Sequence, residues 1–212
     1  TQDPAGKPGV ADMTAALLDE GAGDLDSKAF RERLERRAID ISFNDTRDHL
    51  RGSMRTLKEN RDEAFDLLRL ALNQPRFDAE ALERGRAQAL STLRRQSTSP
   101  NDIASRRFFK EAYGDHPYAW PPSGTLESVP VITADDLRGY AKRVLARDTL
   151  KIAVVGDIDA ATLQTMLDRV FGTLPAKADL RAIPPAVPQV PPARVNVTLD
   201  VPQTVIMFGA PG

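Results

Sequence analysis

The sequence has no cysteine and only two histidines among its 212 residues. Without cysteine there is no disulfide, no thiol nucleophile, no iron–sulfur cluster and no thiolate zinc site. The redox compartment stays undetermined, because a chain without thiols is compatible with both an oxidising and a reducing environment. No apolar run approaches the roughly 18 residues that a membrane-spanning helix needs. The sequence therefore predicts no membrane span.

Neither sign of charge is in excess. Lys and Arg total 29 and Asp and Glu total 30, which leaves a net charge of -1. A surplus of positive charge attracts nucleic acid, so the balance argues against nucleic acid as a partner. With 41% hydrophobic and 28% charged residues, the composition is that of a folded globular chain. The length is enough for one domain plus part of another.

Helices are predicted where apolar residues recur every three or four positions behind a capping residue. Met13, Leu17 and Leu18 form such a stripe in a helix that begins at Val10. Asn60 followed by Glu63 resembles a capping box. Further helices are expected after Asp26 or Ser27, between Asn60 and Pro75, over 79–96, after Ser99, after Thr133 and after Asp159.

Strands are predicted where apolar and polar residues alternate. Residues 39–43 and 50–56, joined by turn residues at 44–46, indicate an antiparallel hairpin with one buried face. Residues 150–155 are rich in β-branched side chains and predict another strand, and 195–199 and 205–208 predict two more. The expected fold class is α+β, an antiparallel β-sheet flanked by helices.

Proline divides the chain. Seven of the sixteen prolines lie between residues 173 and 202, which excludes an amphipathic helix there. We therefore expect an N-terminal α+β domain over 1–175, a Pro-rich linker over 176–194, and the start of a second sheet-containing domain, or an extra strand pair, over 195–212.

Each histidine has a simpler interpretation than catalysis. His49 lies in the second predicted strand, where a partly exposed histidine is ordinary. His116 lies in Gly-Asp-His-Pro-Tyr, where its ring would order a turn by hydrogen bonding. The two are far apart in sequence and provide no local ligand pair, so a zinc site would need both of them and a distant carboxylate.

Several short motifs follow one another in a recognisable order. They are Pro-Gly-Val-Ala at 8–11, the hairpin around 39–54, Asn-Gln-Pro-Arg-Phe at 73–77, Tyr-Gly-Asp-His-Pro-Tyr at 113–118, Gly-Thr-Leu-Glu at 124–127 and Val-Gly-Asp at 155–157. Over about residues 8–175, their order and spacing resemble the insulinase and pitrilysin family of zinc peptidases. The resemblance is to the processing-peptidase-like members, which are built from paired halves.

In active members of that family a helix carries His-x-x-Glu-His, whose histidines bind zinc together with a distal Glu while the first Glu acts as general base. Alignment on residues 9–11 places these positions at Asp12, Ala15 and Ala16, with the distal Glu on or next to Thr92. The resemblance implies that all four have lost their chemistry, Asp12 alone keeping any capacity to bind a metal. Loss of a general base costs about 10²- to 10⁴-fold in rate. We expect no peptide hydrolysis by this chain alone and no cofactor in it.

The resemblance further implies a role in assembly. The expected partner is a homologous active zinc peptidase subunit, which would hold the zinc and form with this chain a heterodimer that binds extended peptides in a chamber. Family members of this kind favour the periplasm. Strands preceding residue 1 are expected to be missing from the sheet, which should show an incomplete or differently paired edge.

Two other functions remain open. One is an active zinc metallopeptidase with relocated ligands, drawn from His49, His116 or Asp12. The other is a non-proteolytic scaffold or binding protein of the same fold.

Overall fold

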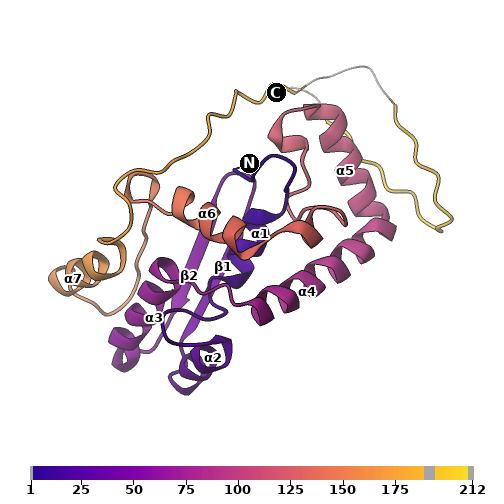
Figure 1. The fold of residues 1–212 in the computed structure, drawn as a ribbon. Helices are drawn as coiled ribbons and strands as arrows, with labels where there is room; N and C mark the ends of the chain where they lie inside the picture. Colours follow the sequence, from indigo (N-terminus) through magenta and orange to yellow (C-terminus); the bar gives the residue numbers. More distant parts are fainter. Residues whose placement is uncertain (1, 189–193, 210–212) are drawn as a thin grey trace.

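A short helix, α1 (Val10–Leu17), lies at the centre of the fold. It packs on strand β1 (Asp40–Asp45) and on helices α4 (Ala79–Thr98) and α6 (Ala134–Val144). The structure is a computed structural model and describes residues 2–188 and 194–209. Figure 1 shows α1 between the sheet and α4, with α4 and α5 (Pro100–Tyr113) forming an arm to one side.

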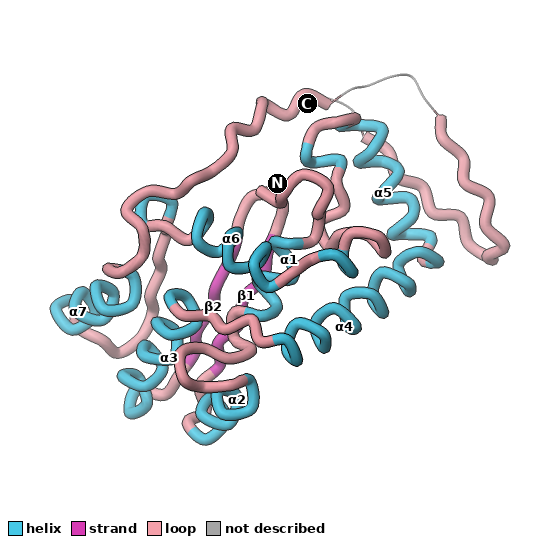
Figure 2. Tube along the Cα trace, viewed as in Figure 1, coloured by secondary structure: helices cyan, strands magenta, loops and turns pink. Residues whose placement is uncertain are grey.

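The remaining elements cover the other end of the sheet (Figure 2). Helix α3 (Arg61–Asn73) packs against α7 (Ala160–Phe171), and α2 (Ser27–Arg36) packs against β1. Single 3₁₀ turns make the connections: η1 (Lys58–Asn60), η2 (Pro117–Ala119), η3 (Val129–Val131) and η4 (Arg147–Thr149).

The predicted hairpin is confirmed. Strand β1 pairs antiparallel with β2 (Leu50–Arg55), and Ile41 lies opposite Met54. Ile41 is buried and Met54 is half-buried, because alternate residues of each strand face the helices. The α+β arrangement predicted from the sequence is therefore confirmed. Within the described residues the sheet holds these two strands, so each has one edge without a partner strand.

The other predicted strands are wrong. Residues 150–155, 195–199 and 205–208 form no ladder in the described part of the chain. Their apolar side chains face solvent, and Val155 is fully exposed. A strand is defined by hydrogen bonds to a neighbour, so β propensity without a partner strand does not produce one.

The predicted helix caps are mostly confirmed. Asp26, Ser99 and Asp159 each accept a hydrogen bond from a backbone N–H in the first turn of the following helix. Thr133 and Asp136 form a reciprocal capping box. The box predicted at Asn60 is wrong, because the side-chain amide of Asn60 donates to the carbonyl of Arg37 (2.8 Å).

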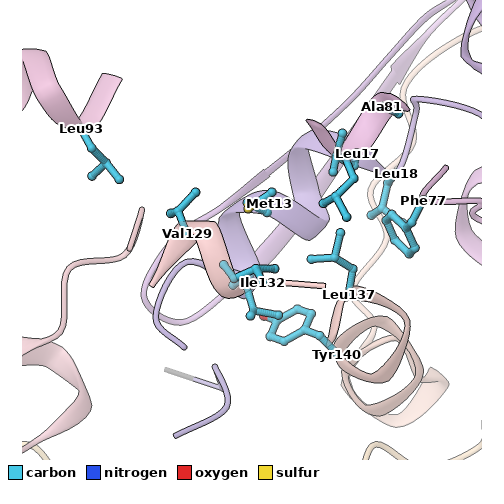
Figure 3. Packing of buried hydrophobic residues seen from close by; sticks show 13 residues of the cluster. Met13, Leu17, Leu18, Phe77, Ala81, Leu93, Val129, Ile132, Leu137 and Tyr140 are labelled. Atoms are coloured by element: carbon cyan, nitrogen blue, oxygen red, sulfur yellow. The ribbon is translucent and has the colours of Figure 1, made fainter. Parts of the chain in front are cut away.

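The predicted apolar stripe of α1 forms the main core, as Figure 3 shows. Val10, Met13, Leu17 and Leu18 are all at most 3% exposed. Their neighbours come from α6, from η3 and from the start of α4, and include Leu137, Tyr140, Val129, Ile132, Phe77 and Ala81. Full burial of such a side chain stabilises the fold by about 1.5–3 kcal/mol. This packing fixes α1 along its whole length.

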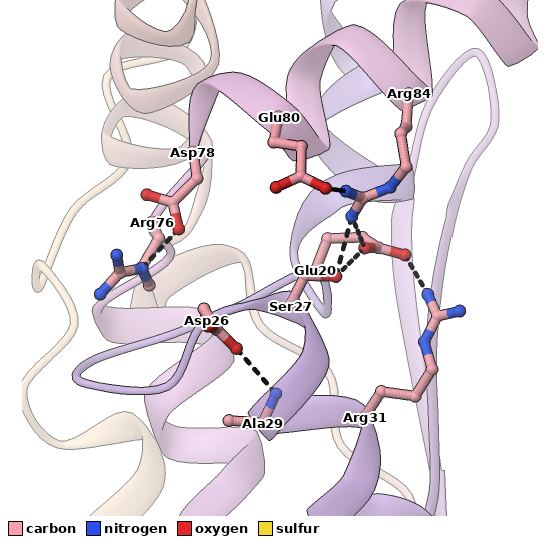
Figure 4. Close-up of polar contacts among 9 residues, drawn as sticks. All are labelled: Glu20, Asp26, Ser27, Ala29, Arg31, Arg76, Asp78, Glu80 and Arg84. Atoms are coloured by element: carbon pink, nitrogen blue, oxygen red, sulfur yellow. Dashed lines mark hydrogen bonds and ion pairs between the residues drawn. The ribbon is translucent and has the colours of Figure 1, made fainter.

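A polar network holds the segment after α1 (Figure 4). The Glu20 carboxylate accepts hydrogen bonds from Ser27 and Arg31 and, at 3.0 Å, from Arg84 of α4. Burial alone would raise the pKa of Glu20, but these bonds and the two arginine charges outweigh it and hold the pKa below its ordinary value. The network joins the exit of α1 to α2 and α4.

Replacing Glu20 by Gln is expected to lower the free energy of unfolding at pH 7 by about 0.5–1 kcal/mol, a modest effect because the network is partly solvent-exposed. Since the pKa of Glu20 is lowered in the folded state, its contribution is present at neutral pH and is lost as the pH falls through that pKa. Urea unfolding at pH 7 and pH 3 measures this. Glu83→Gln, which affects only the pair with Arg86, is the matched control, and equal losses in both variants would contradict the network's role.

Candidate functional site

Helix α1 places two of the aligned positions on one side. Asp12 lies in its first turn and Ala16 one turn later, so the two residues stand on the same face. Ala16 is exposed and Asp12 is half-buried, whereas Ala15 points into the core and is 2% exposed. The face that carries Asp12 and Ala16 is thus the one that reaches solvent.

The start of α1 is fixed by a close backbone contact. Gly9 caps the helix with a φ of 98°, and Gly124, with a φ of 80°, lies against it. A Cβ on Gly124 would stand 2.6 Å from the carbonyl oxygen of Pro8, which also accepts a hydrogen bond from the Ser128 hydroxyl (2.8 Å). Only glycine fits this position. The motifs at 8–11 and 124–127, far apart in sequence, therefore lie in contact at the start of α1.

The fourth aligned position lies on α4. Thr92 is half-buried, and its hydroxyl accepts a hydrogen bond from Arg95 (3.1 Å). The two helices touch where Leu17 packs on Gly85, at which a Cβ would lie 3.1 Å from the leucine. None of the described hydrogen bonds joins Thr92 to Asp12, Ala15 or Ala16.

Asp12 has a partner that the sequence did not indicate. Its carboxylate accepts a hydrogen bond from the carboxyl group of Asp45, the last residue of β1. Burial raises the pKa of Asp12. Burial, followed by the charge and hydrogen bond of Asp12 and the charge of Asp3, raises the pKa of Asp45 to about 7. Below about pH 7 the Asp45 carboxyl is therefore the hydrogen-bond donor of the pair and Asp12 the acceptor.

Asp3 completes this acidic group and was also missed. One of its carboxylate oxygens accepts from the backbone N–H of Gly9 (2.9 Å) and the other from that of Ala11 (2.7 Å). Asp3 is 6% exposed, and burial raises its pKa even though both bonds favour the charged form. It caps the first turn of α1 from outside the helix. An acidic residue several positions before a helix start is not a recognised capping signal.

The loop after α5 covers this group. A cavity of about 10 Å³, room for one water molecule, is lined by Asp3, Ala11, Asp45, Thr46, Arg47, Pro117, Trp120, Pro121 and Pro122. The hairpin turn is tied to the same loop. Arg47 donates to the carbonyl of Tyr118 (3.2 Å), and the Tyr118 hydroxyl donates to Asp48 (2.7 Å).

The two histidines lie outside this group. His49 is exposed and lies in the turn before β2 rather than in the strand, so its predicted place is wrong by one residue. His116 caps η2, its Nδ1 accepting from the backbone N–H of Tyr118 (3.1 Å), and the prediction that its ring orders a turn is confirmed. Among residues 2–188 and 194–209, no group of three or more His, Asp and Glu side chains is arranged to hold a metal ion.

A second hollow lies between α2 and α4. Its volume is about 320 Å³, and charges of both signs line it: Asp26, Lys28, Arg31, Asp78, Glu80 and Arg84. Arg31 and Arg84 already pair with Glu20, and Arg84 also pairs with Glu80. These side chains connect helices and give the hollow no catalytic arrangement.

Comparison with known proteins connects this arrangement to a family. Residues 132–212, from the end of η3 onwards, match the family described as the peptidase M16 inactive domain. The crystal structure of a peptidase M16 inactive domain from Pseudomonas fluorescens matches 86% of this chain with a TM-score of 0.81 and 30% sequence identity. This chain is a relative of the M16 peptidases.

The likeness to M16 proteins covers most of the chain. The "Non-peptidase homolog YmxG" of Helicobacter pylori is 29% identical over 167 residues, which are 79% of this chain. Pitrilysin shares the fold over 88% of this chain, with a TM-score of 0.73 and 18% identity. The resemblance to the insulinase and pitrilysin family is therefore confirmed. The chain covers 39% of the Helicobacter protein and 45% of the Pseudomonas structure.

No helix of the described M16-like fold combines the length and hydropathy that crossing a bilayer requires.

Proposed function

We propose that this chain is a catalytically inactive M16 domain that assembles with an active zinc peptidase subunit and helps to form its peptide-binding chamber. The active partner holds the zinc and performs hydrolysis. This chain contributes a folded wall around α1. Its relatives' descriptions as an inactive domain and a non-peptidase homolog support the first part of the proposal.

The observation that carries the proposal is the Asp12–Asp45 hydrogen bond. Of the four aligned positions, Ala15 and Ala16 carry no atom that could bind a metal. The Thr92 hydroxyl is already hydrogen-bonded to Arg95. The remaining oxygen ligand, the Asp12 carboxylate, is already hydrogen-bonded to the carboxyl group of Asp45. A zinc site needs three or four ligands, commonly His, Cys, Asp or Glu. The side chains at these positions do not fit zinc, so no step of hydrolysis is assigned to them.

Zinc titration tests the absence of a metal site. Chelator-stripped protein near pH 7 is expected to show no calorimetric binding tighter than ~10 µM, a free energy of about -7 kcal/mol. The metal-to-protein ratio after dialysis should be near zero. One tightly held zinc per chain would contradict the proposal and favour an active peptidase with relocated ligands.

Pairing requires its own test. A homologous subunit with an intact His-x-x-Glu-His is expected to form a stable complex with this protein, and peptide hydrolysis should require that subunit's zinc. Analytical ultracentrifugation of the mixture measures the pairing. If the two proteins sediment as separate species, the alternative function, a non-proteolytic scaffold or binding protein of the same fold, is favoured.

A further inference from the structure

The chain that leaves α7 is bonded to the body of the domain. In Figure 1 it runs back past the N-terminus towards α5. Its first part follows the end of α6 and η4 through three hydrogen bonds that use backbone groups of the segment. They are Arg147 N–H to Pro175 O (2.9 Å), Ala178 N–H to an Asp148 carboxylate oxygen (2.9 Å) and Asp179 N–H to Arg143 O (2.9 Å).

The next contact is made by Gln2. Its carboxamide bonds both backbone groups of Arg181, accepting from the N–H at 2.8 Å and donating to the carbonyl at 3.1 Å. This pair of bonds satisfies the backbone as a neighbouring strand would. The Arg181 guanidinium also donates to the carbonyl of Asp3 (2.8 Å).

The last contact is made by His116. Because its Nδ1 accepts from the N–H of Tyr118, the ring proton of the neutral form lies on Nε2. That Nε2 stands 3.0 Å from the carbonyl of Pro184, to which it donates. The η2 turn therefore presents a pre-oriented donor to the segment.

We propose that residues 175–184 are a docked strap that belongs to the domain and fixes the point from which the chain leaves it. The prolines suit this role, because Pro184 and Pro185 have no N–H that would need a partner. The strap is also coupled to α1. Asp3 binds Arg181 through its carbonyl while its carboxylate caps α1 through Gly9 and Ala11.

The strap shortens the free connection to whatever follows. If all of 176–194 were free, an extended Pro-rich segment of that length would span ~60 Å, at ~3.1 Å per residue. With the strap docked, ten residues separate Pro184 from Val195, and a free segment of ten residues could span at most ~30 Å by the same measure. The segment that begins at Val195 is thereby kept within that distance of Pro184, which His116 holds.

Limited trypsin digestion of the whole chain tests the strap, because the sequence supplies two cleavage sites inside it, Lys177 and Arg181, and one beyond it, Arg194. Both arginines are exposed, but the backbone N–H and carbonyl of Arg181 are bonded to Gln2. Cleavage after Arg194 is expected to be at least tenfold faster than after Arg181. Equal rates at the two sites would overturn the proposal.

A double variant, Gln2→Ala with His116→Ala, removes two anchors without touching α6. Cleavage after Arg181 should rise at least fivefold, with cleavage after Arg194 unchanged. Gln164→Ala, on the exposed face of α7, and His49→Ala in the exposed hairpin turn are the matched controls and should change neither rate. Circular dichroism checks that each variant is folded. An unchanged rate after Arg181 in a folded double variant would overturn the proposed anchors.

Hydrogen exchange tests the coupling to α1. The amides of Gly9 and Ala11 are held by Asp3, so their exchange should accelerate when Arg181→Ala removes the strap's bond to the same residue. Amides in the middle of α6 serve as the internal reference. If the two α1 amides exchange as in the unaltered protein, the strap is not coupled to α1.

Discussion

Replacing Asp45 by Asn is expected to stabilise the protein above pH 7 and to flatten the pH dependence of its stability. In the folded protein the Asp45 carboxyl keeps its proton up to about pH 7, whereas its ordinary pKa is 3.8. The stabilising contribution of the protonated pair is therefore complete below about pH 4 and is lost as the pH rises through about 7. Asparagine keeps a hydrogen-bond donor for Asp12 and carries no charge at any of these pH values.

The size of the effect follows from the same pKa. A rise from 3.8 to about 7 corresponds to about 4 kcal/mol for a fully buried group. Asp45 is half-buried, so solvent screening reduces this to about 1–2 kcal/mol. Burial and the charges of Asp3 and Asp45 raise the pKa of nearby Tyr140, and its phenol stays neutral throughout this range.

Urea unfolding between pH 4 and pH 8.5 measures this difference. Asp40→Asn is the matched control, because Asp40 lies exposed at the other end of the same strand, 3.5 Å from Arg55. The chain's one tryptophan, Trp120, lines the same cavity as Asp45, so its fluorescence should report the ionisation of Asp45. A parallel loss of stability with pH in Asp45→Asn and in the unaltered protein would show that the carboxyl pair does not hold this proton.

The helices were predictable because their signals are local. Asp26, Thr133 and Asp159 mark helix starts through hydrogen bonds that span only three residues. The apolar stripe of α1 could be identified for the same reason, since 3.6 residues per turn fixes which side chains share a face. Local patterns could not show whether residues 150–155 form a strand, because a strand depends on a partner strand that its own sequence does not specify.

The candidate site was predictable only in part. The motif order around Gly9 placed Asp12 and Ala16 on one helical face, and α1 has that face. The bond from Asp12 to Asp45 joins positions far apart in the chain through the packing of α1 on β1, which no local pattern encodes. The hydrogen bonds between Arg181 and Gln2 could not be predicted either. A Pro-rich composition indicates an extended chain but does not indicate which residues it contacts.

Restoring ligands to the aligned positions is expected to create a zinc site. In the variant Asp12→His, Ala16→His and Thr92→Glu, two imidazoles lie one turn apart on the solvent-facing side of α1, and a carboxylate lies on α4. This is the donor set of an inverted zincin. We expect one zinc per chain with a Kd at or below ~0.1 µM, at least ~100-fold tighter than the ~10 µM limit expected for the unaltered protein. Calorimetry and the zinc content after dialysis measure it.

The matched control moves the carboxylate by one helical turn. Asp12→His and Ala16→His combined with Gln88→Glu keep the same donor types, but the exposed Gln88 precedes Thr92 by one turn of α4. This control should bind zinc through two histidines alone, and therefore at least tenfold more weakly. Equal affinities would show that Thr92 is not the distal ligand position. If neither folded variant bound zinc, the alignment of Asp12 and Ala16 with the two histidines would itself be wrong, and with it the reason for proposing an inactive peptidase.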